Sequence, residues 1–206
     1  MSISFSSYRT LRVLLAVTGL AIGLCAFSSA AQAACNYPDA EQVFAKWGDS
    51  SYYELAPDGG FEKGGNGWTF TGGAQLVDGN ETEYLNGEED DTALSLPYKG
   101  TATSPKVCVD ENTPLFRLMT LNGGNEQAKL RVIVTYEGTA QKGSGKDPKA
   151  ARNTEIRAGD EWEPTEPLQF DVGDAQERVA QISFTPREGT GEWLVDDLYI
   201  DPFARR

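Results

Sequence analysis

The feature that most constrains this chain is a series of short runs in which every second residue is apolar. The clearest examples are AKLRVIVTYE at residues 128–137 and RVAQISFTP at residues 178–186. Such alternation is typical of a β-strand with one buried face. Further short runs bounded by Gly, Pro, Asn or Asp bring the expected number to about eight to ten strands. A chain with this pattern is expected to fold as an all-β sandwich or barrel.

A helical pattern is confined to residues 37–49, YPDAEQVFAKWGD. Pro38 lies near its start, and Val43, Phe44 and Trp47 follow at helical spacing. The segment is long enough for two or three turns. We therefore expect one short helix before the first strand.

The N-terminus has the features of a secretory signal peptide. Arg9 and Arg12 flank the start of an apolar run, and Ala31-Gln32-Ala33 matches an A-x-A cleavage site. We predict a signal peptide at residues 1–33 and a single β-sandwich domain at residues 34–206. A retained anchor is the competing interpretation, because the apolar run is nearly long enough to span a bilayer. After cleavage we expect no stable membrane insertion and a secreted or cell-envelope location; the oligomeric state stays open.

The charge and the cysteine content of the chain indicate which partners and which redox compartment suit it. The formal charge is −13, and loss of two arginines with the signal peptide makes it −15. Such a surface repels nucleic acid, so we expect no nucleic-acid partner. Cys25 leaves with the signal peptide, and the even pair that remains, Cys35 and Cys108, is predicted to form a disulfide in an oxidising compartment.

The stretch GGFEKGGNGWTFTGGA, residues 59–74, contains seven glycines. No Lys-Ser/Thr pair and no helical pattern follows the glycines, which excludes a phosphate-binding loop. Phe61, Trp68 and Phe70 are core-type residues, which excludes a flexible linker. We predict a tight turn that leads into a strand, in which glycine permits positive φ and close backbone approach.

This stretch resembles the opening of jelly-roll carbohydrate-binding modules of the galactose-binding-like fold. The end of the chain, GEWLVDDLYIDPF at residues 191–203, resembles the aspartate-bearing closing strand of those modules. More closely, nearly all of residues 35–203 resembles a family of exported bacterial proteins of unassigned function. The matching segments are GGFE (59–62), GW (67–68), GNE (79–81), ALSLP (93–97), CV (108–109), LRV (130–132) and WLVDDLYIDP (193–202).

The resemblance implies an all-β, jelly-roll β-sandwich in which the first and last strands lie side by side. It also implies a structural calcium held by Glu62 and an aspartate of the pair Asp196 and Asp197, since calcium binds six to eight oxygen ligands. Strict alternation would place Asp196 with Leu198 on the more apolar face, so Asp196 is the first candidate and Asp197 the second. Ordinary surface carboxylates are the alternative.

The acidic segment DGNETEYLNGEED, residues 78–90, spaces its oxygen ligands like an EF-hand loop. Glu83 occupies the sixth position, where an EF-hand needs glycine, and no helices flank the segment. An EF-hand is excluded. A weak irregular cation site and a solvated acidic loop both stay open.

Function follows from what the chain lacks and from its aromatic residues. With no histidine, the chain cannot form a Ser-His or Cys-His catalytic pair, and we expect no enzyme activity. Trp162, between acids and prolines, and Tyr84, in the acidic segment, are expected to be exposed and to contact a ligand. The expected function is non-catalytic binding of an extracellular or cell-envelope carbohydrate polymer. An adhesive envelope protein that binds a protein partner is the alternative, and a carboxylate-based glycosidase is a third.

Overall fold

A computed structural model describes residues 35, 39–110, 115–123, 125, 127–137, 152–170, 177–188 and 191–201. The predicted signal peptide lies outside these residues. The described part of the chain belongs to one compact unit, Ala33–Arg206. None of its helices is long and apolar enough to cross a membrane.

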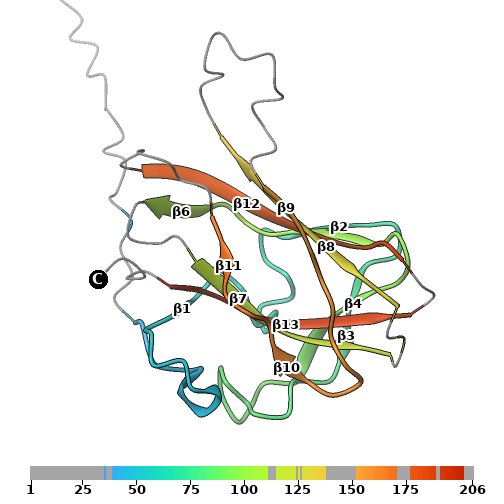
Figure 1. Ribbon diagram of the computed structural model, residues 1–206, viewed down its shortest axis with the longest axis horizontal. Helices are drawn as coiled ribbons and strands as arrows, with labels where there is room; N and C mark the ends of the chain where they lie inside the picture. Colours follow the sequence, from blue (N-terminus) through green and yellow to red (C-terminus); the bar gives the residue numbers. More distant parts are fainter. Residues whose placement is uncertain are drawn as a thin grey trace, which may run out of the picture. The chain divides into compact units, whose positions relative to one another are not determined.

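Two antiparallel sheets form the molecule (Figure 1). The seven-stranded sheet contains β1 (Glu54–Leu55), β3 (Gln75–Asp78), β4 (Thr92–Leu96), β7 (Leu115–Asn122), β10 (Glu163–Pro164), β11 (Leu168–Gln169) and β13 (Trp193–Asp201). The six-stranded sheet contains β2 (Thr69–Thr71), β5 (Thr101–Thr103), β6 (Val107–Asp110), β8 (Leu130–Tyr136), β9 (Arg152–Ile156) and β12 (Glu177–Pro186).

The chain passes repeatedly from one sheet to the other, as it does in a jelly roll. The main path of the seven-stranded sheet runs β10-β7-β13-β4-β3, and that of the six-stranded sheet runs β2-β5-β12-β8-β9. The all-β jelly-roll β-sandwich predicted from the sequence is confirmed. The first and last strands are also neighbours, because β1 pairs with β13 in the register Glu54 to Ile200.

The alternating runs form the strands that close the main core between the sheets. In β8 and β12 the predicted inward residues are all buried: Leu130, Val132, Val134, Tyr136, Ala180, Ile182 and Phe184. Trp193 is fully buried in the same core, and Trp68 is nearly so. Residues from both sheets therefore meet at the period that the sequence predicts.

The glycine-rich stretch is a compact turn held by Asp58. The two carboxylate oxygens of Asp58 accept hydrogen bonds from the backbone N–H groups of Lys63, at 2.9 Å, and Asn66, at 2.5 Å. Gly59 lies so close to β13 that an added Cβ would be 2.6 Å from the carbonyl oxygen of Leu198. The predicted close approach is thus confirmed, and it brings the opening motif against the closing strand.

A second core covers the outer face of the seven-stranded sheet. Its buried members are Phe44, Tyr53, Met119 and Tyr199. Met119 and Tyr199 come from β7 and β13, and the other two come from the segment that precedes or enters β1. Phe44 packs edge-on against Tyr53 and Tyr199, at ring-centroid distances of 4.9 and 5.7 Å. This aromatic cluster fixes residues 41–55 on the sheet.

Within the described part of segment 37–49, the expected helix of two or three turns is a single 3-10 turn, Ala45–Trp47. Gly48 ends it in the left-handed conformation, with φ of 84°. Phe44 is completely buried in the second core, so tertiary packing determines the conformation here more than helical spacing does.

The disulfide predicted between Cys35 and Cys108 is present in the structure. Cys108 belongs to β6 of the six-stranded sheet. The bridge joins residues separated by 73 positions and thereby ties the start of the described chain to the sandwich.

Candidate functional site: a buried carboxylate cluster and an aromatic pocket

A β-bulge positions the two aspartates of the closing strand. The pairing of β13 with β7 shifts register between Asp196 and Tyr199. The inward residues of β13 are Trp193, Val195, Leu198 and Ile200. The step from Val195 to Leu198 is three residues because the bulge adds one residue to the strand. The prediction that Asp196 shares a face with Leu198 is therefore wrong.

Both aspartates are completely buried, but their surroundings differ. In Asp196, Oδ1 accepts the backbone N–H of Asp197 at 2.8 Å, and Oδ2 accepts that of Glu81 at 3.4 Å. Within the described residues, neither carboxylate oxygen of Asp197 has a hydrogen-bond partner. Asp197 also has a φ of 49°, in the left-handed region that few side chains adopt. Such strain and such an unpaired buried carboxylate both indicate a functional position.

The acidic segment supplies the residues around Asp197. Glu81 is completely buried, and its carboxylate accepts the N–H groups of Glu83 and Leu85, each at 2.5 Å. Oδ2 of Asp90 and both polar side-chain atoms of Asn80 are buried and have no partner among the described residues. The acidic segment is therefore not simply a solvated loop, because part of it lies against the aspartate pair.

Glu62 reaches the same region from the glycine-rich stretch. Its Oε1 accepts the N–H groups of Asp91, at 3.2 Å, and Thr92, at 2.9 Å. Beside it, a Cβ added to Gly60 would lie 2.8 Å from Nδ2 of Asn86 and 3.0 Å from Oδ1 of Asp197, so a side chain at this position would crowd both groups. The structure thus brings the opening motif to Asp197, whereas both oxygens of Asp196 bond to backbone N–H groups.

Burial and mutual repulsion raise the pKa of the clustered carboxyl groups. Burial raises the pKa of Asp197 well above its usual range, and the charges of Glu81, Asp90 and Glu62 raise it further. Burial and then the charge of Asp197 raise the pKa of Asp196. The pKa of Asp90 is raised by burial and then by Glu62. Ionising these neighbouring carboxyl groups together is therefore costly in the folded chain unless a cation is bound.

The donor set of this cluster consists of oxygen atoms, which suits a hard cation. The described residues nevertheless contain no ready-made group of three or more Asp, Glu, His or Cys side chains placed as metal ligands. A bound cation would therefore use the unpaired oxygens of Asp197 and Asp90, with amide, backbone or water oxygens to complete its shell.

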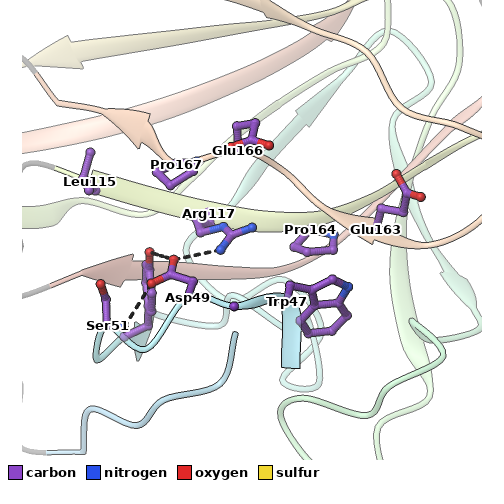
Figure 2. A pocket seen from close by; sticks show the side chains of 11 residues that line it. Trp47, Asp49, Ser51, Leu115, Arg117, Glu163, Pro164, Glu166 and Pro167 are labelled. Carbon is purple, nitrogen blue, oxygen red and sulfur yellow. Dashed lines mark hydrogen bonds and ion pairs between the residues drawn. The ribbon is translucent and has the colours of Figure 1, made fainter. Parts of the chain in front are cut away.

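A pocket of about 570 Å³ opens on the second-core side of the seven-stranded sheet (Figure 2). Its lining residues are Trp47, Gly48, Asp49, Ser51, Tyr53, Leu115, Arg117, Glu163, Pro164, Glu166 and Pro167. Figure 2 shows Arg117 and Asp49 near the centre, with Trp47 and Pro164 on one side and Leu115 and Pro167 on the other. The volume is that of a small-molecule site.

Hydrogen bonds fix the polar groups at the centre of this pocket. Arg117 donates through Nε to the carbonyl of Thr165, at 2.7 Å, and through Nη1 to Oδ2 of Asp49, at 2.8 Å. Tyr53 donates its hydroxyl to the same Asp49 oxygen at 2.6 Å. Burial raises the pKa of Asp49, but hydrogen bonds from Tyr53, Ser51 and Arg117 outweigh it, and the net shift is downward. Asp49 therefore stays ionised as the partner of Arg117.

The two aromatic residues predicted to contact a ligand lie outside this lining. Tyr84 is 50% exposed in the acidic segment, as expected. Trp162 is only partly exposed and packs against the second core, so the expectation that it is exposed is wrong. Trp162 directly precedes the pocket residue Glu163, and its role in binding stays a prediction.

Sequence reasoning did not identify Trp47, Asp49 and Arg117 as site residues. One signal was available for Arg117, because a lone arginine in the otherwise apolar run LFRLMTL implies a buried partner. Asp49 carries no such signal, since it comes from an irregular segment 68 residues earlier in the sequence.

Comparison with known proteins gives no match to a protein-family model. No curated protein sequence matches either. Solved structures with similar folds include a family 61 carbohydrate-binding module in complex with β-1,4-galactotriose, at 16% identity and a TM-score of 0.41. The match covers 71% of this chain and 96% of that module.

A xylan-binding domain of family 22 matches at 14% identity and a TM-score of 0.46, covering 77% of this chain and 99% of that domain. The enzymatically active domain of tailspike protein 4 of bacteriophage CBA120 matches at 18% identity and a TM-score of 0.46. That match covers 71% of this chain but only 21% of the tailspike chain.

Proposed function

We propose that this chain is a secreted or envelope-associated, non-catalytic binding protein for carbohydrate, stabilised by a calcium ion. The observation that carries the binding role is the pocket in which Trp47 stands beside the fixed pair of Arg117 and Asp49. An aromatic ring offers an apolar surface for a sugar ring, and fixed donors and acceptors match its hydroxyl groups.

The polar centre of the pocket is organised before any ligand arrives. Arg117 is only 7% exposed, and its guanidinium lies over the ring of Phe44 at 4.5 Å. Its Nε and Nη1 are already bonded to Thr165 and Asp49. In Figure 2 another guanidinium nitrogen points away from Asp49. A rigid donor of this kind loses little entropy when a ligand binds.

A non-catalytic role suits the two glutamates at the rim. Glu163 and Glu166 are both exposed. A glycosidase acid lies in an enclosed, apolar surrounding, whereas both of these side chains are open to solvent. The pair therefore supports ligand recognition better than bond cleavage.

The calcium proposal rests on the unpaired oxygens of Asp197 and Asp90. A buried carboxylate without a partner is costly, and a divalent cation would remove that cost. Glu62 and Asp196 would support the site through the backbone groups that they hold, and Glu81 would order the acidic segment. The surface charge of the chain also favours cations over nucleic acid.

The test of the binding role is calorimetric titration of the purified protein with a panel of neutral, acidic and amino oligosaccharides. We expect Trp47→Ala to weaken binding at least tenfold, because stacking and hot-spot aromatic contacts have this magnitude. Tyr98→Ala is the control, since Tyr98 is an aromatic residue that, like Trp47, has a neighbouring lysine ammonium over its ring, but it lines neither described pocket.

Two further variants define how far the site extends. Loss of binding in Tyr84→Ala or Trp162→Ala would extend the site beyond the pocket toward the acidic segment. Binding that is unchanged in Trp47→Ala, or absent for every oligosaccharide, would contradict the proposal. If the protein released reducing sugar from any of these oligosaccharides, it would be an enzyme and not a binding protein.

A further inference from the structure

We propose that the pocket selects sugars that carry a free, protonated amino group. This inference rests on the proposed carbohydrate-binding function and specifies its ligand class. The lining of the pocket contains three carboxylates, Asp49, Glu163 and Glu166, and one guanidinium, Arg117. Because Asp49 and Arg117 form an ion pair at 2.8 Å, they largely neutralise each other. Two carboxylates then remain to set the charge of the pocket.

The two remaining carboxylates are available to a ligand. Within the described residues, neither Glu163 nor Glu166 forms an ion pair with a Lys or Arg side chain. Both are exposed, and in Figure 2 they lie across Arg117 from Ser51. Two carboxylates in the pocket lining repel an anionic sugar and attract an ammonium group.

Trp47 adds a second preference for a cation. Its ring already has the ammonium of Lys46 at 5.1 Å from the ring centroid, and Lys46 also forms an ion pair with Glu83. The ring quadrupole that attracts Lys46 would also attract a ligand ammonium that reaches the ring from the pocket. An N-acetylated sugar has the same ring but no charge, so it would gain only the stacking contact.

The polar centre explains why the ligand would be a sugar and not any amine. An amino sugar would present ring hydroxyl groups to the centre of the pocket, where Arg117 and Asp49 have fixed geometry. A lysine side chain or a polyamine has no such hydroxyl groups and would contact only the rim. The two kinds of contact together define a hexosamine that lacks its acetyl group.

The experiment compares fully deacetylated glucosamine oligomers with N-acetylated oligomers of equal length. Titrations are carried out at about pH 6, where a glutamate is ionised and an aliphatic amine holds its proton. We expect the amino oligomers to bind about tenfold more tightly, as two partly screened charge contacts would give. We expect Glu163→Gln and Glu166→Gln each to weaken binding of the amino oligomers about three- to fivefold, and to weaken binding of the acetylated oligomers by a smaller factor.

A matched control separates local charge from net charge. Glu161→Gln removes one carboxylate from the same segment, but Glu161 does not line the pocket. An equal loss in Glu161→Gln and Glu163→Gln would overturn the inference, because only net charge would then matter. Equal affinity for both kinds of oligomer would also overturn it, while the proposed carbohydrate function would stand.

Two other results would distinguish a wrong ligand class from a wrong proposed function. If lysine oligomers bind as tightly as glucosamine oligomers, the pocket is a general amine site and the sugar class is wrong. If no oligosaccharide of any charge binds, the proposed function fails and this inference fails with it. Selective binding of amino oligomers that requires Glu163 and Glu166 would support both the proposed carbohydrate-binding function and the preference for amino sugars.

Discussion

The outer faces of the two sheets differ in whether their polar side chains have hydrogen-bond partners. On the six-stranded sheet, hydroxyl groups pair across strands: Thr101 with Thr185 at 2.8 Å, and Thr103 with Ser183 at 2.9 Å. On the seven-stranded sheet, a second aromatic core covers β7 and β13, and beside it Asp197 and Asp90 have buried oxygens without partners among the described residues.

This difference separates a face with paired hydroxyl groups from the face on which we propose the two sites. Paired hydroxyl groups contribute modestly to a sheet and need nothing further. Unpaired buried carboxylates raise the free energy of the folded chain until a ligand compensates them. The second face therefore holds both proposed sites.

The largest effect is expected at the centre of the pocket. Arg117→Met removes the buried cation of an ion pair and leaves the carbonyl of Thr165 without this donor, while Asp49 keeps only the hydrogen bonds from Tyr53 and Ser51. We expect a loss of about 3 kcal/mol in the free energy of unfolding, measured by denaturant titration. Arg117→Met with Asp49→Asn should recover part of the loss. A change below about 1 kcal/mol in the single variant would mean that the pair contributes little, as exposed pairs do.

Calcium is expected to have the next largest effect. A cation that binds only the folded state adds about 2.7 kcal/mol at one hundred times its Kd. For a domain of this size the Tm should rise by about 5 to 10 °C, and a chelator should reverse the rise. Asp197→Asn should abolish the response without harming the fold, because asparagine tolerates positive φ and carries no charge. An equal Tm in calcium and chelator would contradict the calcium proposal.

The pH dependence of stability should differ with and without calcium. The unfolded chain releases the protons of Asp196 and Asp197 near pH 4, whereas burial keeps these protons bound in the folded, metal-free chain to higher pH. In that interval the folded state binds more protons, so its stability falls as pH rises. In chelator, the Tm should therefore decrease from about pH 5 to pH 8 more in the native protein than in Asp197→Asn.

Calcium should remove most of this decline, since it stabilises the ionised carboxylates. The difference in Tm between calcium and chelator should then grow with pH over the same interval. A difference that is constant with pH would show that the aspartates of β13 are not the groups that bind the cation.

The smallest effect is expected on the six-stranded sheet. Thr103→Val combined with Ser183→Ala removes both members of a hydroxyl pair and leaves no unpaired group. We expect a change of less than about 0.5 kcal/mol in the free energy of unfolding, because replacing both partners is nearly neutral. Ligand and calcium binding should be unchanged. A loss as large as that in Arg117→Met would contradict the contrast between the faces.

Local patterns predicted the strands and the compact turn, whereas contacts between distant segments decided the sites. The alternation in β8 and β12 depends on neighbours in the sequence, so Val132 and Ile182 were placed correctly. Alternation failed at Asp196, because a bulge changes the period within one strand. The doubled aspartate in the apolar run WLVDDLYI is the one local sign of that bulge.

The burial of Glu81 and the pocket itself had no comparable sign. Glu81 lies in a segment whose composition is that of a solvated loop, yet its backbone N–H is a donor to Asp196. The pocket joins Trp47, from before the first strand, to Arg117 in β7 and Glu163 in β10. No period or spacing in the sequence relates these three positions.

The pairing of β1 with β13 has a consequence for the order in which the protein assembles. Glu54 and Ile200 lie at opposite ends of the described chain, so contact between them closes a very long loop. Contacts of such sequence separation form slowly and late. The main core can begin to form from hairpins such as β3 with β4, whose partners are close in sequence. The carboxylate cluster, which needs both the glycine-rich stretch and β13, would form only after β13 has paired, so the proposed cation uptake would report this late step.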